Sequence, residues 1–176
     1  TCGEHSWTYS GLDQAANRLA QVVVAHGGGP GERVALLLPR SGEAIVAILA
    51  VLKCGAAYLP MDPAHPDARI RFMISDAAPV AVLTTAELRA RLDGADVAVI
   101  DVADPAVAEQ PGRGSPEPAA DDIAYLTYTS DTTGVPKAVA VTHQNVTQLL
   151  ERLHPALPAG AGHVWSQWHS LVFDVS

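Results

Sequence analysis

Short apolar runs alternate with longer amphipathic segments along most of the chain. Four of the runs are apolar almost throughout, which is typical of strands buried on both faces of a sheet; they lie at 33–39, 80–85, 97–101 and 123–128. Between these runs, apolar residues recur at helical spacing. This strand–helix–strand order predicts an α/β fold in which helices cover the faces of a mainly parallel sheet.

The first two helical segments carry recognisable capping residues. Ser10 can cap the first helix, and His26 followed by Gly27 is typical of a helix end. Ser41 can cap a second helix at 42–53. Because this second segment is apolar almost all round, we expect its helix to be largely buried.

The remaining pattern predicts shorter elements. Further helices are expected at 67–76, 86–92 and about 143–153, the last one capped by Thr142. A short strand that ends in a turn is expected at 57–63, and additional strands are expected at 138–142 and within the aromatic-rich stretch 163–176. The stretch 103–121 holds four prolines and two glycines, and we expect it to be a surface loop within one lobe rather than a linker between domains.

Composition and charge exclude several functional classes. The chain has 176 residues and a net charge of −8, which argues against a broad nucleic-acid or anionic-membrane surface. Its two cysteines lack metal-ligand spacing, as expected for reduced thiols in a cytoplasmic protein. No apolar run reaches membrane-spanning length, so we expect no membrane contact. The chain begins with Thr1 rather than Met, which suggests an excised piece or a processed product.

One loop between two predicted strands, 129–137, concentrates groups that suit a phosphate. Hydroxyl side chains, a glycine and a lysine stand close together; they belong to Thr129, Ser130, Thr132, Thr133, Gly134 and Lys137. The loop is not a P-loop, because no Gly-Lys-Ser/Thr sequence opens a helix there. Its composition alone suits a triphosphate or an ordinary hydroxyl-rich surface turn equally well.

Four stretches together resemble a known family. They are "WTYSGLDQAANRLA" near the start, "LKCGAAYLPMDP", "YTSDTTGVPKAVAVTH" around the hydroxyl-rich loop, and "FDVS" at 173–176. In this order and spacing the chain resembles the N-terminal part of an amino-acid adenylation domain of a nonribosomal peptide synthetase. Such domains belong to the adenylate-forming superfamily, which also includes acyl-CoA ligases and luciferases. The resemblance implies a three-layer α/β lobe, a partial N-terminal subdomain of the adenylate-forming fold spanning 1–176.

The resemblance also implies a reaction. Family enzymes join a carboxylate to the α-phosphate of ATP, release pyrophosphate, and pass the acyl group to a phosphopantetheine thiol on a carrier protein. By analogy the triphosphate would be lined by Thr129, Ser130, Thr132, Thr133 and Gly134, with Lys137 as a neighbouring cation and Mg²⁺ sharing the phosphate charge. Asp174 matches the family's aspartate that pairs with the α-ammonium group of an amino-acid substrate.

The chain departs from the family pattern in three ways. Asp131 and Ala138 stand where the family has glycines, and Asp131 places a negative charge in the phosphate loop. The family's adenine-binding loop, ribose-binding aspartate and C-terminal catalytic lysine have no counterpart. We therefore expect a partial amino-acid adenylation domain that is inactive alone, exposes apolar surface and can self-associate. A non-catalytic interaction module and a piece of an acyl-CoA ligase are the alternatives, and Asp174 disfavours the second.

Overall fold

A six-stranded sheet of order β4-β3-β1-β2-β5-β6 forms the centre of the structure. The structure, a computed structural model, describes residues 1–3, 5–112, 117–129, 136–153, 166–167 and 169–172. The strands are β1 Arg33–Leu37, β2 Ala57–Met61, β3 Ala81–Thr84, β4 Ala98–Asp101, β5 Ile123–Thr129 and β6 Lys137–Thr142. All neighbouring strands pair in parallel except β5 and β6, which form an antiparallel hairpin. The predicted α/β class with a mainly parallel sheet is confirmed.

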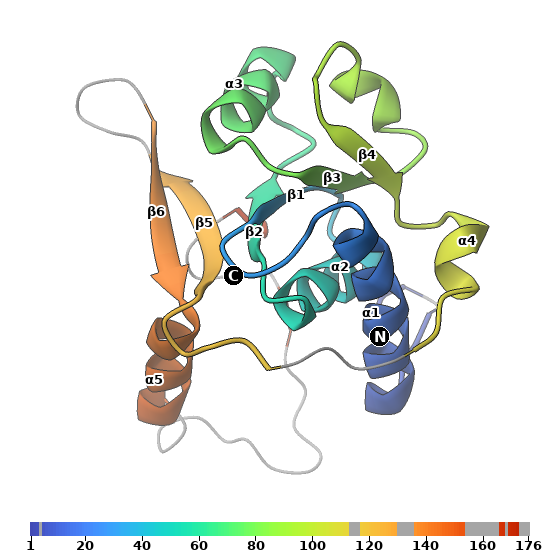
Figure 1. Ribbon diagram of the computed structural model, residues 1–176, viewed down its shortest axis with the longest axis vertical. Helices are drawn as coiled ribbons and strands as arrows, with labels where there is room; N and C mark the ends of the chain where they lie inside the picture. The colour runs from blue at the N-terminus through green and yellow to red at the C-terminus, as the bar shows by residue number, and fades with distance from the viewer. Residues whose placement is uncertain (4, 113–116, 130–135, 154–165, 168, 173–176) are drawn as a thin grey trace.

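Helices cover both faces of the sheet, which gives the predicted three layers (Figure 1). The helices are α1 Tyr9–Ala25, α2 Gly42–Lys53, α3 Asp67–Ala77, α4 Pro105–Ala108 and α5 His143–Leu153, with a 3-10 turn η1 at Arg89–Leu92. Helices α1 and α2 lie on one face, and α3 and η1 lie on the other.

The alternation of side chains along β1 explains why its apolar run is continuous. Val34 and Leu36 pack into the core on the α1/α2 face, whereas Ala35 and Leu37 pack into the core on the α3 face. Successive side chains of a strand point to opposite faces, so a strand covered on both sides needs apolar residues at every position. The run at 33–39 therefore marks a central strand.

Two capping predictions differ in outcome. Helix α2 spans the predicted 42–53, and the Ser41 hydroxyl accepts a hydrogen bond from the Ala44 N–H at 3.2 Å. Helix α1, however, is capped by Thr8, whose hydroxyl accepts from the Gly11 N–H at 3.0 Å. The prediction of Ser10 was wrong because Thr8 has the extended backbone typical of an N-cap, while Ser10 already lies inside the first helical turn.

Helix α2 is largely covered, as predicted. Within it only Glu43 is exposed, and its fully buried positions include the small residues Ala44, Ala47 and Ala50. Small side chains let helices approach closely, and α1 and α2 pack against each other on this face of the sheet. The helix therefore anchors the layer next to β1 and β2.

Two predicted elements near the middle of the chain were wrong in extent. The helix expected at 86–92 is only the single turn η1, which buries Leu92 and is too short to gain much from further helical hydrogen bonds. The loop 103–121 contains the short helix α4, and its Gly112 carbonyl accepts from Asn17 Nδ2 of α1 at 3.3 Å. Most of its described residues are nevertheless exposed.

The C-terminal stretch also differs from its prediction. The described residues 166–167 and 169–172 form no strand, and 171–172 lie in a turn; the rest of the expected strand lies outside the described residues. Before that stretch, helix α5 follows β6 directly. The Thr142 hydroxyl accepts from the Asn145 N–H at 3.2 Å, which confirms Thr142 as a cap.

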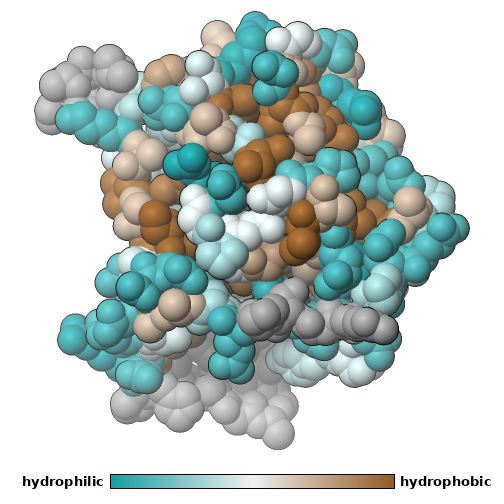
Figure 2. Space-filling view, viewed as in Figure 1, coloured by the Kyte–Doolittle hydropathy of each residue, from teal (hydrophilic) through white to brown (hydrophobic). Residues whose placement is uncertain are grey.

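The hairpin β5–β6 and helix α5 carry exposed apolar side chains. Figure 2 shows apolar surface on the side of the molecule where Figure 1 places the hairpin. The exposed residues in this region are Ile123, Val139, Leu149, Leu150 and Leu153. This part of the structure therefore exposes apolar surface, as expected from the sequence.

Candidate functional site

The carboxyl ends of β1, β2 and β5 meet at one edge of the sheet, because these three strands run parallel. The chain leaves β1 towards α2 on one face and leaves β2 towards α3 on the opposite face. Between two such strands the connections diverge and leave a crevice, which is where open α/β sheets bind ligands. A ligand-binding site is therefore expected at this edge.

A cavity of about 590 Å³ opens at this edge. Its wall consists of residues that follow β1, residues that follow β2, and a segment from near the end of the chain: 38–40, 61–64 and 169–172. Arg40, Asp62, His169 and Ser170 supply polar groups to an otherwise mainly apolar wall. Segments more than 100 residues apart thus meet at the crevice that the strand order predicts.

The hairpin β5–β6 brings two of the predicted phosphate-binding residues together. Thr129 ends β5, Lys137 begins β6, and the two are directly paired across the hairpin. Directly opposed residues of an antiparallel pair have Cβ atoms about 5 Å apart, so the hydroxyl and the ammonium group can reach one anion. Both side chains are exposed.

The rest of the predicted phosphate loop is not among the described residues. Ser130, Asp131, Thr132, Thr133 and Gly134 lie outside the described residues, as does the predicted substrate-binding residue Asp174. Ala138 is described: it pairs with Tyr128 and does not have a positive φ, so an alanine strains nothing where the family has a glycine.

The segment that precedes Asp174 is anchored to the sheet by two hydrogen bonds. The Ser170 hydroxyl donates to Asp62 Oδ2 at 2.6 Å, and the Thr127 hydroxyl of β5 donates to the Val172 carbonyl at 3.2 Å. Leu171, between them, packs against the core on the α1/α2 face. Residues 170–172 are therefore held at the carboxyl edge of β2 and β5.

The Asp62 carboxylate is satisfied at both oxygens. Its Oδ1 accepts from the Ala64 N–H at 2.8 Å, and its Oδ2 accepts from Ser170. Burial opposes its ionisation, but the bonds from Ser170 and Ala64, together with the charges of His65 and Arg40, outweigh burial and hold the pKa of Asp62 below its ordinary value. Asp62 therefore accepts the Ser170 hydrogen bond as a carboxylate at neutral pH, which strengthens the bond.

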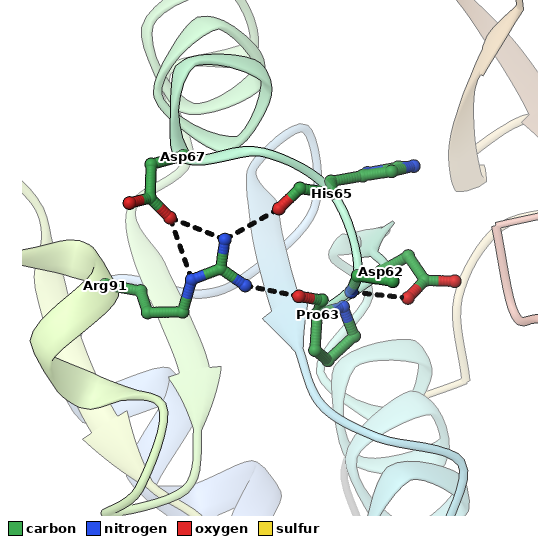
Figure 3. A network of polar contacts seen from close by, with 6 residues as sticks. Asp62, Pro63, His65, Asp67 and Arg91 are labelled. Atoms are coloured by element: carbon green, nitrogen blue, oxygen red, sulfur yellow. Dashed lines mark hydrogen bonds and ion pairs between the residues drawn. The ribbon is translucent and has the colours of Figure 1, made fainter.

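Arg91 of η1 fixes the turn that carries Asp62 (Figure 3). Its Nε donates to Asp67 Oδ1 at 2.8 Å, its Nη2 donates to the His65 carbonyl at 2.6 Å, and its Nη1 donates to the Pro63 carbonyl. Arg91 and Asp67 also form an ion pair at 2.5 Å. One guanidinium group thus joins the turn after β2 to the start of α3.

The sequence alone did not identify Asp62, Ser170 and Arg91 as parts of this edge. Asp62 had a usable signal, since it follows a buried strand directly, and polar residues at the carboxyl ends of parallel strands gather at ligand sites. Ser170 and Arg91 had none, because their contacts join positions 108 and 24–28 residues apart.

The described parts of the chain lack two kinds of feature. They contain no group of three or more His, Cys, Asp and Glu side chains placed to hold a metal ion. They also contain no helix that is long and apolar enough to span a membrane.

The chain resembles known proteins over its full length. The model of the AMP-binding enzyme family matches residues 1–176. The isonitrile lipopeptide synthase of Mycobacterium tuberculosis is 56% identical over 99% of the chain, and the dimodular nonribosomal peptide synthase of Bacillus subtilis is 41% identical over 96% of it. The chain spans only 7% and 8% of the length of these two relatives.

A solved structure extends the likeness to three dimensions. The nonribosomal peptide synthetase FmoA3, crystallised with AMPPNP bound, superposes with a TM-score of 0.86 and is 30% identical. The alignment covers 95% of this chain and 18% of the FmoA3 chain. The observed lobe is therefore the same one that a nucleotide-bound relative contains.

Proposed function

The chain belongs to the AMP-binding enzyme family and forms part of a nonribosomal peptide synthetase adenylation domain, and we propose that within the complete domain it binds ATP and helps to activate an amino acid. In this reaction the substrate carboxylate attacks the α-phosphorus of ATP. The bond to the β-phosphate breaks, and pyrophosphate leaves. The phosphopantetheine thiol of a carrier protein then attacks the acyl carbonyl and displaces AMP.

The pairing of Thr129 with Lys137 is the observation that carries this proposal. A hydroxyl donor and a cation flank the loop of this hairpin, at the carboxyl edge of the parallel sheet. Ser130, Thr132, Thr133 and Gly134 would complete the triphosphate site from the intervening loop. Each donor stabilises negative charge on the phosphate oxygens, most of all on the departing pyrophosphate.

Mg²⁺ is proposed to accompany the nucleotide. Mg²⁺ commonly binds through substrate phosphates and one or two carboxylates, and keeps several water molecules. It would share the phosphate charge with Lys137.

Asp174 is proposed to recognise the α-ammonium group of the amino acid. The described residues that precede it, 170–172, are anchored at the same sheet edge as Thr129. A carboxylate at this point in the sequence would select an amino acid over a carboxylic acid that lacks the amino group. We place the reaction in the cytoplasm, where the free thiols of Cys2 and Cys54 would remain reduced.

ATP–pyrophosphate exchange tests the proposal. A polypeptide that joins this sequence to the remainder of an adenylation domain is assayed with each of the twenty amino acids at saturating Mg-ATP. We expect exchange with at least one amino acid, most readily after Asp131→Gly removes the negative charge from the loop, and none from the 176-residue chain alone. Exchange with carboxylic acids that lack an amino group, and with no amino acid, would instead indicate an acyl-CoA ligase. Absence of exchange with every acid, both with Asp131 and after Asp131→Gly, would favour a non-catalytic module.

The exposed apolar residues of β6 and α5 support a separate proposal for the isolated lobe. Val139, Leu149 and Leu150 are between 45% and 60% exposed, and such a group of side chains favours association. We propose that the 176-residue chain self-associates through this surface. Light scattering over a concentration series should show a rising mass, and a constant monomer mass would contradict it.

A further inference from the structure

One hydrogen bond joins the turn after β2 to a segment 108 residues further along the chain. The Ser170 hydroxyl donates to Asp62 Oδ2 at 2.6 Å, and both residues are only partly exposed. A short bond to a carboxylate is about twice as strong as a bond between neutral groups. This contact therefore has the strength to set the position of the segment that contains Ser170.

We propose that Asp62 is a positioning residue for recognition of the amino-acid substrate, acting through Ser170 on the segment that leads into "FDVS". This inference rests on the proposed function. Asp62 touches neither ATP nor the substrate in this account. Together with Thr127, which holds the Val172 carbonyl, it fixes residues 170–172, and Asp174 is two positions further along the chain.

The Asp62 carboxylate is well suited to act as a fixed point. Its other oxygen is held by the Ala64 N–H, and the His65 N–H donates to the Asp62 carbonyl at 2.9 Å. Arg91 secures the same turn through the carbonyls of Pro63 and His65 (Figure 3). Because the turn is held on both sides, a displacement of Ser170 cannot be absorbed by movement of Asp62.

The two hydrogen bonds differ in what they hold. The bond from Thr127 fixes only the backbone at Val172, whereas the bond from Ser170 fixes a side chain and links the segment to a different strand. Two anchors, one on β5 and one in the turn after β2, restrict both the position and the rotation of the segment. Loss of either one should loosen the geometry of substrate binding without touching the triphosphate site, since small misplacements of binding groups are costly.

The test is a set of substitutions in the adenylation-domain polypeptide described above, assayed by pyrophosphate exchange at saturating Mg-ATP. Ser170→Ala should raise the KM for the amino acid about tenfold, while the KM for ATP stays within about twofold. Asp62→Asn should raise it about threefold, because an amide can still bond to the hydroxyl, but without the charge. Ser170→Thr keeps a hydroxyl and should restore most of the affinity.

The matched control is Ser166→Ala, the same change at an exposed serine of the same segment. It should leave both KM values unchanged. The double variant Asp62→Asn with Ser170→Ala should be no worse than Ser170→Ala alone, since both changes remove one contact. Each variant is also prepared with Asp131→Gly, so that weak ATP binding cannot hide an effect on the amino acid.

Three outcomes would overturn the inference. The first is an unchanged amino-acid KM for Ser170→Ala. The second is an equal rise in the KM for ATP and the KM for the amino acid, which indicates a general loss of structure. The third is absence of exchange by the unsubstituted protein with Asp131 or Gly at that position, which defeats the proposed function as well. If Asp62→Asn does not fold, Ser170→Ala and Ser170→Thr still decide the question.

Discussion

The sheet has two regions that differ in how completely they are covered. Strands β1, β2 and β3 are buried at nearly every position, with helices on both faces. Strand β6 is exposed at its first four positions, and the helix α5 that follows it has no buried residue. The covered region supplies the packing that makes the lobe stable, whereas the hairpin presents Thr129 and Lys137 at an accessible edge. The packing that stabilises the lobe and the proposed phosphate contacts therefore lie in different parts of one sheet.

The largest difference between the regions should appear in the free energy of unfolding. Leu37→Ala removes a side chain that is fully buried on the α3 face, and we expect a loss of about 2–5 kcal/mol. Val139→Ala, in the exposed β6, is the matched control and should cost less than about 1 kcal/mol. Urea denaturation of the 176-residue chain measures both. Equal losses would mean that the hairpin is as well packed as the centre.

The contact between the two regions, where β2 packs beside β5, can be tested through the pH dependence of the free energy of unfolding. Tyr58 of β2 stacks on Tyr125 of β5 with ring centroids 5.4 Å apart, and burial, followed by the nearby Tyr125, raises the pKa of Tyr58 to about 12. A pKa raised in the folded state means that stability is intact below pH 10 and falls as the pH rises from 10 towards 12. By pH 12 this loss approaches about 2–3 kcal/mol.

Tyr58→Phe removes the ionising group and should flatten this part of the stability curve. The free energy of unfolding is measured for both chains from pH 8 to pH 12, and their difference at pH 8 corrects for the lost hydroxyl. If the two curves run parallel above pH 10, ionisation of Tyr58 does not weaken the contact between β2 and β5.

The affinity of the hairpin loop for Mg-ATP should depend strongly on one charge, that of Asp131. A carboxylate about 5 Å from one phosphate charge costs roughly 3 kcal/mol at an effective dielectric constant near 20. We therefore expect very weak or no binding of Mg-ATP by a complete domain with the native loop, and binding at least tenfold tighter after Asp131→Gly. Titration calorimetry on the pair measures the change. Equal affinities would mean that the Asp131 carboxylate points away from the phosphates.

The covered region was the easier one to predict from the sequence. A strand that is buried on both faces must be apolar throughout, so the runs containing Val34 and Leu83 identify β1 and β3 directly. The cap at Ser41 could also be predicted, because capping depends on only a few neighbouring residues. Local chemistry was enough for the cap at Ser41 but not at the start of α1, where Thr8 caps the helix in place of Ser10.

The edge was harder, because its contacts join distant segments. The proximity of Thr129 and Lys137 could be predicted, since both flank one short loop. The link from Ser170 to Asp62 and the contacts of Arg91 depend on the way in which the strands are ordered in the sheet. The helix predicted at 86–92 was wrong for a similar reason. The Arg91 side chain bonds to the turn after β2, and Leu92 is the only buried residue of this stretch.

The most direct test of the central claim is the effect of Lys137 on the affinity for Mg-ATP. In a complete domain carrying Asp131→Gly, Lys137→Ala should weaken binding about tenfold, because a cation beside the triphosphate is lost. Lys53→Ala is the control, since Lys53 forms its ion pair with Asp13 of α1. Titration calorimetry should show weaker binding for the first variant and unchanged binding for the second. Unchanged affinity after Lys137→Ala would contradict the placement of the triphosphate at the β5–β6 hairpin.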